Sequence, residues 1–154
     1  MRFTSATLFF LLGLAVALPA NTGGSSNKDA LVKGINDNLK AGDKEISATQ
    51  KAQDAAKKND AAGLKKNEQG INGALDEAIK DREKNQKIAG NKDPALTAGL
   101  GKVENAQKGA KATVSQLTGN PKQDEGGLQQ LDATFKKGKT TNTQNLEEAK
   151  KNFH

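Results

Sequence analysis

The large apolar residues of this chain are few, and most of them recur at intervals of three and four residues. Counted from Leu18 onwards, Leu, Ile, Val and Phe number 21, which is about 15% of the residues and below the roughly 20% that separates globular from disordered composition. The net charge is only +6, however, and disorder by composition usually combines low hydrophobicity with high net charge. Because the three-four spacing is the period of one helix face, we expect a helical fold.

Four stretches of the sequence carry this helical period, over residues 32–56, 64–89, 96–117 and 128–153. Short polar breaks that contain Gly or Pro separate them. Short loops make neighbouring helices run up and down, so we predict an all-α fold, an antiparallel four-helix bundle over residues 28–154. Interior glycines weaken helices relative to alanine, so we expect the bundle to be loosely packed.

The breaks between the stretches have recognisable helix signals. Asp93 is suited to an N-cap and Pro94 to the first helical position, which together predict a helix start. Gly90 marks the end of the preceding helix. The segment Thr118–Pro121 ends the third helix, because proline cannot continue a helix. We expect a weak point in the last helix at Gly138–Thr141, where Gly and β-branched Thr lower helix propensity.

The first residues have the order of a secretory signal peptide. Arg2 supplies a positive start, residues 8–18 are almost entirely apolar, and an Ala-Val-Ala motif ends at Ala17. We predict cleavage after this motif, hence a signal peptide over residues 1–17 and a secreted protein, extracellular or bound to the cell wall. Residues 18–27 are rich in Gly and Ser and predict a flexible, disordered leader. The apolar run is shorter than the roughly 20 residues that cross a bilayer, so we expect no transmembrane segment.

The chain lacks the residues that most catalytic and metal sites require. It has no cysteine, and its only histidine, His154, is the last residue. Triads and zinc sites built on Cys or His are therefore not expected. We predict that the chain is not an enzyme and binds no cofactor and no metal. The lysines alternate with acids along the chain, and only Phe135 and Phe153 are aromatic beyond the signal peptide, so no nucleic-acid partner is expected.

The candidate site is the apolar interior of the bundle. Ligands of helix bundles bind between the helices, so the inward-facing residues either fill the core or enclose an acyl chain, and both alternatives stay open. The same stripes can instead turn outward onto an oily or waxy surface, as amphipathic helices do on lipid. The candidate core or ligand-lining residues are Ile35, Leu39, Ile71, Leu75, Leu100, Val103, Val114, Leu131 and Phe135.

One family shares this combination of features. A signal ending in Ala-Val-Ala before Leu18, the absence of cysteine and four Ala-rich amphipathic helices resemble the fungal small secreted helical proteins of the hydrophobic-surface-binding and cell-wall galactomannoprotein type. The resemblance covers the whole chain in architecture and transfers no functional residue. It implies an extracellular or wall-associated protein whose partner is a hydrophobic surface, a cell-wall polymer or a lipid.

Two other functional classes stay open. The richness in Gly, Lys, Ala, Gln and Asn is similar to that of stress-protective proteins of the late-embryogenesis kind, which are hydrophilic and largely unfolded in water. The other class is a secreted effector that binds a host protein through one exposed helix face, although no residues mark such a face. In each of these cases we expect a monomer.

Overall fold

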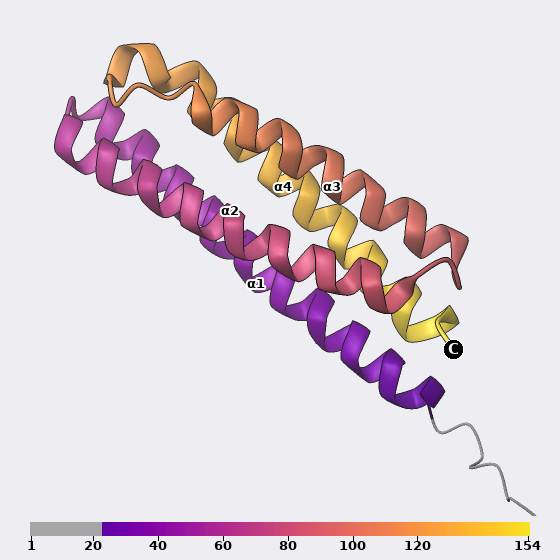
Figure 1. The fold of residues 1–154 in the computed structure, drawn as a ribbon. Helices are drawn as coiled ribbons and strands as arrows, with labels where there is room; N and C mark the ends of the chain where they lie inside the picture. The colour runs from indigo at the N-terminus through magenta and orange to yellow at the C-terminus, as the bar shows by residue number, and fades with distance from the viewer. Residues whose placement is uncertain (1–22) are drawn as a thin grey trace, which may run out of the picture.

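The computed structural model describes residues 23–154, which fold into four α-helices and no strand (Figure 1). The helices are α1 (Gly23–Lys57), α2 (Ala61–Ala89), α3 (Pro94–Ser115) and α4 (Pro121–Asn152). The all-α fold predicted from the three-four spacing is therefore confirmed. The predicted signal peptide over residues 1–17 and the first part of the predicted leader, residues 18–22, lie outside the described residues.

The four helices run alternately in opposite directions. Figure 1 shows α1 starting at the end of the bundle where the C-terminus lies, with α2 returning to that end and α3 and α4 repeating the path. α1 packs against α2 and α4, and α3 packs against the same two helices. This arrangement is the antiparallel four-helix bundle expected for helices joined by short loops.

Side-chain caps mark the starts of α2, α3 and α4, and the one at Asp93 is the cap that the sequence predicted. Asp60, Asp93 and Asn120 each accept hydrogen bonds from backbone N–H groups in the first turn of the helix that follows. Such caps satisfy backbone donors that have no partner inside the helix. Gly90 ends α2 with φ 53°, a conformation that glycine adopts without a side-chain clash.

Two helices differ from the sequence prediction, α1 in where it begins and α4 in its continuity. α1 begins at Gly23, so the last five residues of the predicted leader are helical, because extending a formed helix gains a backbone hydrogen bond per residue without a new nucleus. α4 runs unbroken through Gly138–Thr141. There the hydroxyls of Thr140 and Thr141 donate to carbonyl oxygens one turn earlier, both at 3.1 Å, and keep these threonines compatible with the helix.

The inner face of α1 is rotated slightly from the predicted stripe. Leu39 and Ile46, which the stripe placed at its centre, are half-buried at the edge of the core. Asn38 and Glu45, one residue earlier in each case, are buried instead. The polar side chain of Asn38 finds its partners inside the bundle, which hydropathy alone does not indicate.

The apolar core is divided into two clusters along the bundle. The turn-end cluster lies where the α1–α2 and α3–α4 turns meet and contains Ala52, Ala55, Leu64, Ile71, Leu75, Ala110, Leu128, Leu131 and Phe135. The terminus-end cluster lies at the opposite end and contains Leu31, Ile35, Ala89, Leu96, Leu100, Leu146, Ala149 and Phe153.

Candidate functional site in the bundle interior

The nine residues singled out from the sequence contribute to both apolar clusters. Seven of them are buried, and Leu39 and Val114 are half-buried against the cluster edges. The terminus-end cluster takes Ile35 and Leu100, the turn-end cluster takes Ile71, Leu75, Leu131 and Phe135, and Val103 is buried outside both. Because the set is split between two clusters, it does not enclose one continuous apolar space.

A layer of buried polar side chains separates the two clusters. We call it the polar layer, and it consists of Asn38, Glu45, Arg82, Asn85, Gln107, Asn142 and Asn145. All four helices contribute to it. Buried polar groups in a bundle are tolerated when they hydrogen-bond one another, so their pairing decides whether the layer stabilises or weakens the fold.

Amide side chains connect three of the helices across the layer. Asn38 on α1 donates from Nδ2 to the carbonyl oxygen of Ala78 on α2 at 2.5 Å. Its Oδ1 accepts a hydrogen bond from Nδ2 of Asn142 on α4. Asn145 donates from Nδ2 to Oδ1 of Asn142 at 3.3 Å, which extends the chain of amides along α4.

Arg82 connects α2 to α3 in the same layer. It is the chain's only arginine apart from Arg2, and its side chain is 7% exposed. Its Nε donates to Oε1 of Gln107 at 3.0 Å, and its guanidinium lies 3.8 Å from the carboxylate of Glu104. Hydrogen bonds from Lys108 and Gln86 lower the pKa of Glu104 to about 2, so that carboxylate stays charged beside the guanidinium.

Two asparagines of the layer occupy notches that glycines leave open. A Cβ atom at Gly34 would lie 2.0 Å from Oδ1 of Asn85, and one at Gly99 would lie 1.8 Å from Oδ1 of Asn145. Both distances are far below van der Waals contact, so any larger residue must displace the asparagine. These glycines therefore serve close packing between α1 and α2 and between α3 and α4.

The carboxyl of Glu45 is not fully hydrogen-bonded within the layer. Its residue is 5% exposed, and its Oε1 has no hydrogen-bond partner within residues 23–154. Burial raises the pKa of Glu45 to about 8, so the carboxyl is neutral at neutral pH.

The interior has almost no free space beside this carboxyl. Glu45, Gln107 and Val103 line a cavity of about 20 Å³ that Gly42 and Gly138 help to keep open. Such a volume holds about one water molecule, whereas ligand sites usually have about 300–1,000 Å³. This cavity is therefore too small to hold an acyl chain.

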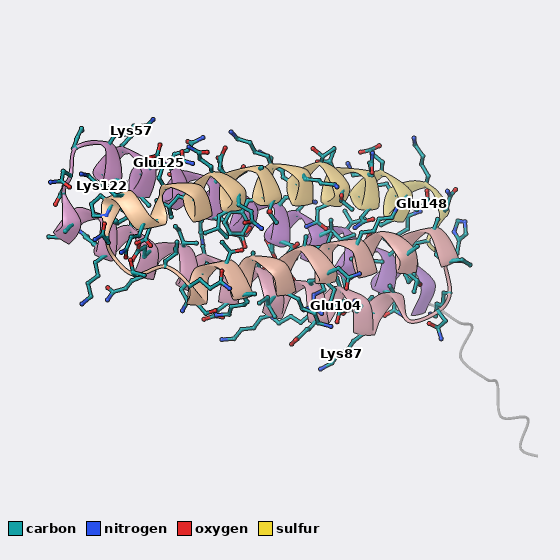
Figure 2. All side chains as sticks on the ribbon, turned by 90° about the horizontal axis from the view of Figure 1, so that it is seen from above. Lys57, Lys87, Glu104, Lys122, Glu125 and Glu148 are labelled. Carbon is teal, nitrogen blue, oxygen red and sulfur yellow. The ribbon has the colours of Figure 1, made fainter. Side chains whose placement is uncertain are left out.

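The outer surface carries shallow grooves between neighbouring helices. One of about 420 Å³ lies between the end of α1 and the start of α4. Its rim includes Lys57, Lys122 and Glu125, which Figure 2 shows together at one end of the bundle. Ala56 and Leu128 contribute apolar atoms to its floor. The mixed charges of this rim indicate a solvated surface rather than a site for one class of ligand.

The polar layer was not among the predictions made from the sequence, although two signals pointed to it. Gln107 and Asn142 fall on the apolar stripes of the third and fourth helices. Arg82 stands alone in a chain that otherwise uses lysine for its positive charges beyond the signal peptide. Arginine is preferred where a cation must hydrogen-bond in a buried position, so a single arginine on an inner face suggests such a role.

Residues 23–154 contain no group of three or more His, Cys, Asp and Glu side chains that could hold a metal ion. Within residues 23–154, no helix combines the length and the continuous apolar character that spanning a bilayer requires. No protein-family model, curated protein or solved structure matches this chain.

Proposed function

We propose that this chain is a secreted, non-enzymatic protein that adsorbs to hydrophobic or cell-wall surfaces by opening its bundle. The division of the apolar core by the polar layer is the observation that carries this proposal. The four helices have 35, 29, 22 and 32 residues, and each is amphipathic. On opening, each helix can lie flat with its apolar stripe on the surface and its lysines in water.

The polar layer lowers the free energy needed to open the bundle. Oε1 of Glu45 and Oδ1 of Asn85 are buried without a hydrogen-bond partner in the described structure. A buried polar group without a partner costs about 1–3 kcal/mol, which is substantial against a total stability of about 5–15 kcal/mol for a domain. Opening on a surface returns these groups to water while the Leu, Ile and Phe side chains stay away from it.

Surface adsorption fits the interior better than a closed lipid pocket does. The cavity beside Glu45, at about 20 Å³, is too small for an acyl chain. Most of the candidate residues are divided between two separate clusters. A lipid would therefore meet the apolar stripes only after the helices separate, which is the same event as adsorption.

Two leucine-to-alanine variants test the opening step. Leu75 is fully buried in the turn-end cluster, whereas Leu39 is half-buried at the edge of the core. Leu75→Ala leaves a core cavity and is expected to destabilise the bundle by about 2–5 kcal/mol. Leu39→Ala removes the same atoms with a smaller loss of stability. Drop tensiometry at an oil–water interface would measure how fast each protein lowers the tension.

We expect Leu75→Ala to adsorb faster than both the wild type and Leu39→Ala, because its bundle opens more readily. Ile71→Val, expected to cost about 0.5–1.5 kcal/mol, serves if Leu75→Ala does not fold. If the adsorption rates of the variants follow their apolar content and do not follow their stability, adsorption by opening of the bundle is rejected.

Secretion is tested by the intact mass of the protein collected outside the producing cells. Loss of residues 1–17 is the expected result, and retention of these residues would contradict secretion.

A further inference from the structure

Two carboxyl groups meet where the α3–α4 turn lies against α2. Glu68 belongs to α2 and Asp124 to the first turn of α4. Their side chains are within hydrogen-bonding contact of each other. Oε1 of Glu68 and Oδ2 of Asp124 are both buried and have no donor partner in the described residues. Two facing acceptors leave both oxygens unsatisfied unless one carboxyl carries a proton.

Asp124 is already committed to the turn that precedes it. Its Oδ1 accepts hydrogen bonds from the backbone N–H of Thr118 at 2.8 Å and from the Thr118 hydroxyl at 3.0 Å. Burial alone would raise the pKa of Asp124, but these bonds and the contact with Glu68 hold it below its ordinary value. Asp124 is therefore the ionised, accepting member of the pair.

Glu68 has the opposite environment. Burial raises its pKa to about 7, and the hydrogen bond and negative charge of Asp124 act in the same direction. The backbone N–H of Gly119 in the α3–α4 turn and, to a smaller extent, the charge of Lys65 favour ionisation of Glu68 and only partly offset these effects. The turn residues 116–120 bring no titratable side chain, and Lys122 on α4 is exposed. Glu68 is therefore the group that holds the proton.

We propose that Glu68 and Asp124 share one proton, and that this proton fastens the α3–α4 turn and the first turn of α4 to α2. One hydrogen atom between the carboxyls satisfies both unpaired oxygens at once. The contact acts as a latch that is closed in mildly acidic solution. Near pH 7 Glu68 loses the proton, two carboxylates then face each other, and the turn is released.

The sign of the pH effect follows from the protons bound in each state. A freed Glu68 titrates near its ordinary pKa of 4.5, whereas the latched group titrates near 7. Between these values the latched state binds more protons, so release becomes easier as pH rises. From pH 5.5 to 7.5 the opening constant of residues 118–124 is expected to increase roughly twentyfold, because it rises by almost tenfold per pH unit below pH 7 and levels off above it.

Hydrogen exchange and carboxyl NMR on the full protein test the latch. The opening constant of residues 118–124, corrected for the intrinsic pH dependence of exchange, is compared at pH 5.5 and 7.5. Glu68→Gln keeps an N–H donor facing Asp124 but cannot titrate, so its turn should stay protected at both pH values. Glu77→Gln on the exposed side of the same helix should behave like the wild type.

The proposal is overturned if Glu68 titrates near 4.5 in the ¹³C spectrum, or if Glu68→Gln keeps the wild-type increase in opening. A divalent cation between the carboxyls would also overturn it. That case would show as protection of the turn at pH 7.5 by added Ca²⁺ and its reversal by a chelator.

Discussion

Replacing Glu45 by Gln isolates the energetic effect of one buried carboxyl in the polar layer. Glutamine has nearly the same shape and cannot ionise, so the fold and the cavity beside it are preserved. In the wild type, burial raises the pKa of Glu45 to about 8 from an ordinary value of 4.5. Folding at neutral pH therefore requires this group to take up a proton that the unfolded chain does not bind.

The magnitude follows from proton linkage. Because the folded pKa is raised, the unfolded chain binds fewer protons between about pH 4.5 and 8, and the free energy of unfolding falls as pH rises through this range. One group contributes at most about 1.4 kcal/mol per pH unit. Between pH 5.5 and 7.0 the wild type should lose about 2 kcal/mol more stability than Glu45→Gln.

Urea unfolding at several pH values between 5.5 and 7.0 measures this difference. The chain has no Trp and no Tyr, so the helix signal in circular dichroism is the appropriate probe. The ionisable pair Glu68 and Asp124 is present in both proteins, so its contribution to the pH dependence cancels in the comparison. Equal pH dependence of wild type and Glu45→Gln would refute the burial of this carboxyl between the two clusters.

The glycine notches and the helix register yield further predictions. Gly99→Ala should destabilise the bundle, because its Cβ would lie 1.8 Å from Oδ1 of Asn145. Gly109→Ala, whose Cβ meets no atom within 4 Å, should instead gain about 1 kcal/mol from helix propensity; equal effects in urea unfolding would argue against the notch. Ala48→Cys with Gly70→Cys should form a disulfide on oxidation, because the two Cβ positions are 3.7 Å apart. The bond should stabilise the oxidised form by about 3 kcal/mol over the reduced form, and failure to form it under mild oxidant would contradict the α1–α2 register.

The helices and their ends could be predicted because their signals are local. Asp93 and Pro94 define the start of α3 by their own side chains, and Gly90 ends α2 by its own backbone. The stripes also identified most of the apolar core, since large side chains at helical spacing have few alternatives to burial. The beginning of α1 and the continuity of α4 were not predicted, because they depend on the extension of an existing helix and not on local start or stop signals.

The polar layer could not be predicted because its partners are distant in sequence. Asn38 can be buried because it hydrogen-bonds to Ala78 and Asn142, which are 40 and 104 positions away in the sequence. Hydropathy favours Leu39 at the same turn, and nothing within α1 reverses that preference. The roles of Gly34 and Gly99 likewise depend on asparagines that only the folded chain places against them.

Neutron reflectometry of the layer adsorbed at a hydrophobic surface tests the proposed opening most directly. An opened chain lays its helices flat, so the layer should be about 10–12 Å thick, the diameter of one helix with its side chains. A bundle that adsorbs closed stacks two helices above the surface and should give a layer of roughly twice that thickness. The thinner layer at low coverage is the predicted result, and the thicker one would contradict adsorption by opening.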